Sequence, residues 1–166
     1  VGVEIDKTMS KFHIIDGIRL NQVMLNLLSN AIKFTEKGFV KIHCKTITTE
    51  DNFQQIKFSV SDSGIGLSKE SISKVFDSFM QAEQDTSRKY GGTGLGLSIS
   101  KSLVSQMGAT LFVDSEEGVG SIFYFNLNLE KSLSFIKEFK PKKAILTNLS
   151  PVLDYKKLKR LLPKNT

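Results

Sequence analysis

The chain has 166 residues, which is enough for one domain with a buried core and too few for two full-sized domains. No stretch approaches eighteen consecutive apolar residues, and a single cysteine excludes an internal disulfide framework. The net charge of +6 belongs to the tail: residues 1–130 hold 13 basic and 15 acidic side chains, whereas residues 131–166 hold 10 and 2. We therefore expect neither nucleic acid nor a membrane as a direct partner of the main domain.

Two short runs of alternating apolar residues begin the chain and predict two short strands, at residues 1–5 and 12–15. His13 lies within the second run. We interpret it as a half-exposed strand residue, because no second ligand or catalytic partner stands near it in the sequence.

A long helix is predicted next, over residues 17–35, with Asp16 as its N-cap. Apolar residues fill one broad side of this helix, and a narrow arc carries polar residues: Arg19, Gln22, Asn26, Asn30 and Lys33. Such an arc is normally the solvated face of a surface helix. Two asparagines one turn apart are unexpected there, because asparagine is a mediocre helix former. They suggest that amide oxygens and a lysine point at a ligand.

Strands at residues 39–47 and 56–62 predict a hairpin, joined by the polar segment 48–54. Alternation around Cys44 predicts that this residue is a small buried side chain, and a reactive thiol is the less favoured alternative.

Asp62 extends the apolar face of the second hairpin strand, and Gly64 and Gly66 follow it directly. A carboxylate at the inner end of a core-facing row must find hydrogen-bond donors. Two interpretations remain open: Asp62 caps the turn that follows, or it accepts a hydrogen bond from an N–H group of a ligand.

The second half of the chain begins with a short helix, predicted for residues 68–79 and capped by Ser68. A polar stretch at 80–90 has the composition of a mobile lid. Four glycines at 91–96 then run into an apolar helical pattern that stops at Gly108 and consists of Leu97, Ile99, Ser100, Leu103, Val104 and Met107. A glycine-rich loop that opens a helix favours an anion such as a phosphate, although glycines there often serve turn geometry alone. A last hairpin is predicted at 110–115 and 121–129.

Taken together, these segments resemble the ATP-binding catalytic domain of sensor histidine kinases, of the Bergerat-fold superfamily. The resemblance covers about residues 10–130 and rests on five motifs in order. Residues 26–35 (NLLSNAIKFT) resemble the N box, 62–66 (DSGIG) the first glycine motif, and 76–79 (FDSF) the phenylalanine box. Residues 91–97 (GGTGLGL) resemble the second glycine motif, and 118–121 (GVGS) the last one.

The resemblance implies an α+β fold, a two-layer α/β sandwich with a mixed sheet of about five strands and three helices on one face. Residues 1–130 would form the ATP-binding catalytic domain. Residues 131–166 would be a basic C-terminal extension, either the start of a receiver-like domain of a hybrid kinase or a plain extension.

The resemblance also implies the cofactors ATP and Mg²⁺ and a set of site residues. Asn30 would bind Mg²⁺, Asp62 would accept the adenine amino proton, and Phe34 would pack near the adenine or ribose. The catalytic group would comprise Asn26, Lys33, Arg88 and Lys89. The other nucleotide contacts would come from Gly64, Ile65, Gly66, Gly92, Thr93, Gly94, Leu95, Gly96, Leu97 and Ser121.

Hydrolytic members of the superfamily carry a glutamate, as general base, where this chain has Asn26, so the resemblance favours a kinase over an ATPase. Neither His13 nor His43 stands in the family's phosphoacceptor motif. We therefore expect a fragment that donates its γ-phosphate to a histidine on a separate dimerisation domain and acts with a response regulator or receiver domain. It would be cytoplasmic, or the cytoplasmic part of a membrane-bound sensor kinase. A pseudokinase that binds ATP without transfer, and an anti-sigma-type serine kinase, remain the alternatives.

Overall fold

The structure is a computed structural model that describes residues 1–10, 13–77 and 94–131. The proposed lid at 80–90, the first glycines of the second glycine motif and the basic extension after Lys131 lie outside the described residues.

A mixed sheet forms one layer of the molecule. Its strands are β1 (Gly2–Ile5), β2 (His13–Ile14), β3 (Val40–Thr49), β4 (Phe53–Asp62), β5 (Phe112–Glu116) and β6 (Gly120–Lys131). The order is β1-β3-β4-β6-β2, and β5 also pairs with β6. Only the β1–β3 pairing is parallel among these strands. The sheet thus has six described strands where we expected about five.

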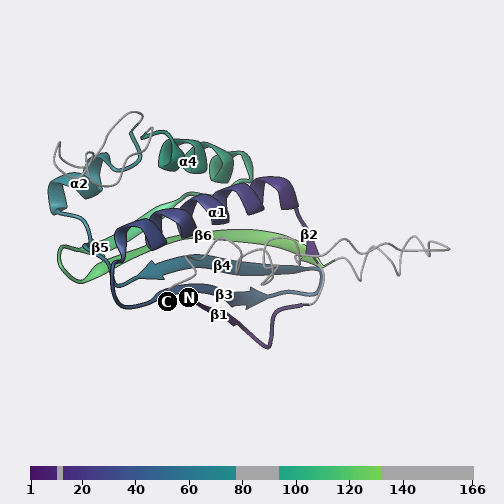
Figure 1. Cartoon of the computed structure of the whole chain (residues 1–166). Coiled ribbons are helices and arrows are strands. Elements are labelled where there is room, and N and C mark those ends of the chain that lie inside the picture. Colours follow the sequence, from purple (N-terminus) through teal and green to yellow (C-terminus); the bar gives the residue numbers. More distant parts are fainter. Residues whose placement is uncertain (11–12, 78–93, 132–166) are drawn as a thin grey trace.

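Helices form the second layer, and they are α1 (Gly17–Phe34), α2 (Lys69–Lys74) and α4 (Gly96–Gln106). Figure 1 shows α1 lying along one face of the sheet, with α4 beside it and running in the opposite direction. The expected two-layer α/β sandwich is confirmed. Of the helices in the described ranges, none is both long and apolar enough to cross a membrane.

The core lies between α1 and the sheet, because both elements present apolar residues at the period of their own secondary structure. The α1 side of this core consists of Leu20, Val23, Met24, Leu27, Leu28 and Ala31, all buried. The sheet contributes the inward rows of β3, β4 and β6. Cys44 is one of these inward residues, and burial raises the pKa of its thiol to about 11. It is the small buried side chain that the alternation predicted.

Three local predictions were wrong. The helix after Ser68 ends at Lys74, and Phe76, which we expected within it, lies in the following turn and packs edge-on against Phe123, with ring centroids 6.3 Å apart. Ile99, counted in the apolar pattern of α4, is 45% exposed. His13 is buried rather than half-exposed, and its Nε2 lies 2.9 Å from the Oε1 of Gln54, which belongs to β4, on the other side of β6.

Candidate functional site

One stripe of α1 joins two parts of the molecule that are distant in sequence. Asn26, Asn30 and Phe34 are spaced by four residues and therefore follow one another along a single side of the helix. The Asn26 side chain packs against Gly96, at the start of α4. The Phe34 carbonyl packs against Gly64, in the loop that follows β4. Asn30 thus lies between the start of α4 and the Asp62 loop.

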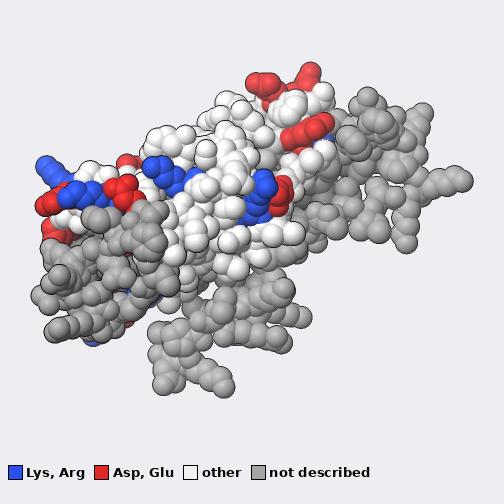
Figure 2. All heavy atoms as spheres, turned by 90° about the horizontal axis from the view of Figure 1, so that it is seen from above, with Lys and Arg blue, Asp and Glu red and all other residues white. Residues whose placement is uncertain are grey.

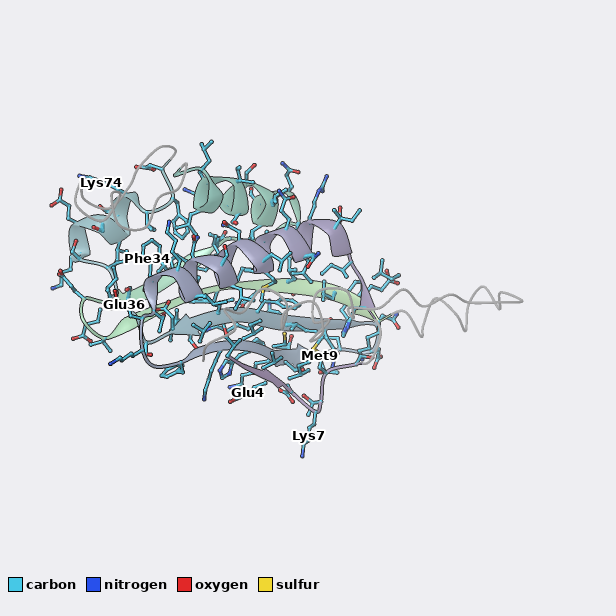
Figure 3. All side chains as sticks on the ribbon, in the orientation of Figure 1. Glu4, Lys7, Met9, Phe34, Glu36 and Lys74 are labelled. Carbon is cyan, nitrogen blue, oxygen red and sulfur yellow. The ribbon has the colours of Figure 1, made fainter. Side chains whose placement is uncertain are left out.

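Figure 1 shows the same arrangement at the level of the fold. The start of α4, the end of α1 and the end of β4 all lie at one end of the molecule, the left end in that view. Figure 3 shows Phe34 at this end of α1, with Glu36 just beyond it. The expected N box, first glycine motif and start of the glycine-bearing helix are therefore neighbours in space.

Asn26 and Asn30 differ in what surrounds them. The Asn26 Nδ2 donates to the Ser100 hydroxyl at 2.8 Å, so this amide bridges α1 and α4. Asn30 is half-buried, and within the described part of the chain its amide makes no hydrogen bond. The ammonium of Lys33, one turn from Asn30, lies 4.9 Å from the centroid of the Phe34 ring.

Asp62 is buried, with 9% of its surface exposed, at the end of the inward row of β4. Its Oδ1 accepts from the N–H of Gly64 at 2.9 Å, and the backbone of Ser121 also donates to it. Burial raises the pKa of this carboxyl, and the two N–H donors partly offset that rise. Asp62 therefore caps its own turn, as one of the two interpretations had it, and a buried acid of this kind is also typical of functional sites.

The loop after Asp62 is fixed by neighbouring backbone rather than left open. The N–H of Ile65 donates to the Phe34 carbonyl at 3.3 Å, and the N–H of Gly118 donates to the Ile65 carbonyl at 2.7 Å. A Cβ at Gly64 would overlap the Phe34 carbonyl, and a Cβ at Gly66, where φ is +67°, would overlap the Glu116 carbonyl. These two glycines thus allow close packing of the main chain.

The β5–β6 hairpin supplies the other anchor of this loop. The Ser115 hydroxyl accepts from the N–H of Leu67 at 2.8 Å and donates to the Gly120 carbonyl at 2.9 Å. It also lies 2.9 Å from the Ser121 hydroxyl. The side chain of Ser121 is thus engaged within the hairpin, and its main chain is the part that meets Asp62.

The start of α4 differs from the starts of α1 and α2 because no side chain of the described residues caps it. Leu95 is the N-cap and makes no side-chain hydrogen bond, whereas Asp16 and Ser68 cap α1 and α2 with their side chains. Gly94 has φ +69°, a left-handed conformation that suits glycine. The first-turn N–H groups, including those of Gly96 and Leu97, are therefore available to an anion.

Four predicted site residues, Arg88, Lys89, Gly92 and Thr93, lie outside the described residues. Two others that matter here were missed by the sequence analysis. Ser100 belongs to the apolar pattern of its helix. A polar residue in such a pattern was the signal that its hydroxyl has a hydrogen-bond partner, which is Asn26. Ser115 gave no signal, since a serine in a hairpin strand is ordinary.

Comparison with known proteins gives a consistent family. Residues 15–131 match the family described as "Histidine kinase-, DNA gyrase B-, and HSP90-like ATPase". The chain is 47% identical over 120 residues to Histidine protein kinase 1 of Candida albicans, covering 72% of this chain and 5% of the relative. It is 49% identical over 112 residues to Hybrid signal transduction histidine kinase B of Dictyostelium discoideum, covering 68% and 6%. The chain thus spans a small part of these relatives.

A solved structure is similar as well. The crystal structure of full-length ShkA in complex with AMPPNP superposes with a TM-score of 0.61 and 31% identity, covering 78% of this chain and 26% of that one. The motifs, the sandwich and these likenesses agree: the chain belongs to the family of histidine kinase-, DNA gyrase B- and HSP90-like ATPase domains, on its histidine kinase branch.

Proposed function

We propose that this chain binds Mg-ATP and donates the γ-phosphate to a histidine on a separate dimerisation and phosphoacceptor domain. The observation that carries the proposal is the α1 stripe. Asn30, a half-buried amide without a hydrogen bond to the described residues, lies between a buried carboxylate loop and a helix start whose N–H groups are not capped by any side chain of those residues. An adenine nucleotide needs an acceptor for the base and donors for the phosphates, and these are the groups that the stripe connects.

Asp62 would select adenine, because its carboxylate accepts from the exocyclic amino group, whereas guanine presents a carbonyl at that position. Gly64, Ile65 and Gly66 form the wall of this part of the site, and Phe34 would lie against the base or ribose. The start of α4, with Gly94, Leu95, Gly96 and Leu97, would donate main-chain N–H groups to the phosphates, and Gly92 and Thr93 would extend this run.

The residues also fit a magnesium ion bound with the nucleotide. Mg²⁺ prefers oxygen ligands and usually takes only one or two from the protein, with waters and phosphate oxygens completing its shell. The Asn30 amide oxygen is suited to that role, and the bound ion would neutralise phosphate charge during transfer. Lys33, Arg88 and Lys89 would add positive charge near the γ-phosphate.

An acceptor other than water is favoured by the residue one turn before Asn30. A water nucleophile needs a general base, and Asn26 carries an amide that cannot take a proton. The Nδ2 of this amide already donates a hydrogen bond to the Ser100 hydroxyl. The γ-phosphate would thus be kept for a nucleophile on a partner, and the named relatives, two histidine kinases, suggest a histidine. ATP as the donor implies a cytoplasmic location.

The charge distribution suits this function better than nucleic-acid binding. Figure 2 shows that the described residues of the helix-bearing face carry Lys, Arg, Asp and Glu side chains interspersed, rather than a continuous basic area. A response regulator or receiver domain would act later in the relay, after the histidine.

Calorimetric titration with Mg-ATP tests the site directly. Asp62→Asn and Asn30→Asp should each abolish measurable binding and leave the circular dichroism spectrum unchanged. Asparagine at 62 still accepts from the Gly64 N–H, so its effect would not come from lost folding. Wild-type affinity in either variant would contradict the proposed roles.

Phosphoryl transfer is tested by adding the isolated helical phosphoacceptor domain and labelled ATP. Label that is acid-labile and base-stable is expected, as for phosphohistidine. Label with the reverse stability would instead support a serine kinase, and binding without label a pseudokinase.

A further inference from the structure

We infer that Asn26 and Ser100 form a positioning pair that fixes the start of α4 against α1 and so sets the affinity of the site for the phosphates of its nucleotide. The inference rests on the proposed function. It assigns Asn26 an action through α4, and it assigns Ser100 a role that the motifs do not mention.

The contact between the two side chains lies in an otherwise apolar part of the helix pair. Ser100 is 1% exposed, and Val104, one turn along α4, is fully buried. A hydroxyl in such a place costs free energy unless it is hydrogen-bonded. Asn26 satisfies it at 2.8 Å, and any shift of α4 by one residue or one turn along α1 would break that bond. The pair therefore selects one register of the two helices.

A second contact from the same amide acts on the first turn of α4. The Asn26 Oδ1 packs against Gly96 so closely that a Cβ at Gly96 would overlap it. Gly96 is the first residue of α4, and Ser100 lies one turn later. One amide thus contacts two successive turns of α4, which fixes both the position and the tilt of the helix start.

The consequence falls on the phosphate end of the site. The uncapped N–H groups belong to the turn that Asn26 touches, and Asn30 lies one turn further along α1. Moving α4 would change the spacing between the phosphate donors and the proposed magnesium ligand. The Asp62 loop would stay, because it is anchored by different groups, at Phe34, Ser115 and Gly118.

The test compares Ser100→Ala with Ser105→Ala, a matched change at an exposed serine of the same helix. Dissociation constants are measured for Mg-AMPPNP and for adenosine, which lacks phosphates. We expect Ser100→Ala to weaken Mg-AMPPNP binding roughly tenfold and adenosine binding less than about twofold, since a factor of ten corresponds to 1.4 kcal/mol, about one net hydrogen bond. Ser105→Ala should change neither dissociation constant.

Asn26→Ala and the double variant complete a double-mutant cycle. The double variant should lose no more Mg-AMPPNP affinity than Asn26→Ala alone, because the two side chains act through one bond. Asn26→Ala also covers the case in which alanine at 100 does not fold: it should show the same selective loss of Mg-AMPPNP.

The inference is overturned if Ser100→Ala binds both ligands like the wild type, or if its affinity for both falls by the same factor. It is also overturned if the losses of Mg-AMPPNP affinity in Ser100→Ala and Asn26→Ala add up in the double variant. These outcomes are separate from failure of the proposed function, which would appear as wild-type protein that does not bind Mg-AMPPNP at all.

Discussion

The two ends of the candidate site, both rich in glycine, are built in opposite ways. At the Asp62 end, the loop is held by main-chain and serine hydrogen bonds, and Asp62 already has two N–H donors. At the α4 end, no side chain of the described residues caps the first turn, and we propose that its position depends on the Asn26 amide of α1. The Asp62 end, where we propose that the adenine base binds (the base end), is therefore already hydrogen-bonded, whereas the α4 end, where we propose that the phosphates bind (the phosphate end), keeps N–H donors for a ligand.

The glycines show what this difference means physically. At Gly64 and Gly66 a side chain would meet backbone atoms, which cannot move without moving a strand or a helix. At Gly96 it would meet the end of an asparagine side chain. The same residue type thus allows contact with the main chain at one end and contact with a single side chain at the other, and substitutions should separate the two.

The largest effect is expected from Gly66→Ala. A methyl group there overlaps the Glu116 carbonyl, and φ of +67° adds backbone strain. The free energy of unfolding should fall by roughly 2–5 kcal/mol, the sum of an overpacking cost and a left-handed residue. Urea unfolding measures it. Gly17→Ala is the control, since a Cβ added there would meet no other group within 4 Å. It should change the free energy of unfolding by less than about 0.5 kcal/mol. Equal stability of the two variants would contradict the rigid base end.

Ser115→Ala should come next. It removes the acceptor for the partly buried N–H of Leu67, and leaving such a donor without a partner should cost roughly 1 kcal/mol, the lower end of the range for buried donors. Because Ser115 anchors the base end, adenosine and Mg-AMPPNP should lose affinity by the same factor. A loss confined to Mg-AMPPNP would show that the hairpin acts on the phosphates instead.

Gly96→Ala should cost less stability than Gly66→Ala, about 1 kcal/mol, because the Asn26 side chain can rotate away while alanine favours the helix. Its effect on binding should be the reverse of that of Ser115→Ala: weaker Mg-AMPPNP and nearly unchanged adenosine. Titration calorimetry with both ligands checks this, and a stability loss as large as that of Gly66→Ala would contradict the view that a single side chain is all that Gly96 must avoid.

The smallest effect concerns the charge on Asp62. Burial raises its pKa above the model-peptide value of 3.8, so the folded state favours the protonated acid. Asp62 therefore contributes stability fully below pH 3.8 and loses that contribution as the pH rises through its folded pKa. In urea unfolding, the stability of the wild type relative to Asp62→Asn should decline as the pH rises from 3.8 through the folded pKa of Asp62. A relative stability that instead rises with pH would mean that the two N–H donors outweigh burial.

Much of the fold could be predicted because its elements are strongly periodic. The 3.6-residue pattern of α1, the alternation in β3 and β4 and the order of the motifs were sufficient for the sandwich and for the inward position of Asp62. Predictions failed where one long-range contact decided the outcome. Phe76 packs against Phe123 instead of continuing α2, and His13 contacts Gln54, and neither partner lies near its target in the sequence.

By itself, then, the sequence pointed to the side chains that we propose carry the chemistry, because asparagines on a helix and a carboxylate at a strand end are local departures from a regular pattern. Only the tertiary structure decided how those side chains are used. It engaged Asn26 with Ser100, 74 residues away, and left the Asn30 amide without a hydrogen bond within the described part of the chain. Hydrogen bonds between distant segments depend on how helices and strands pack, and no local periodicity encodes them.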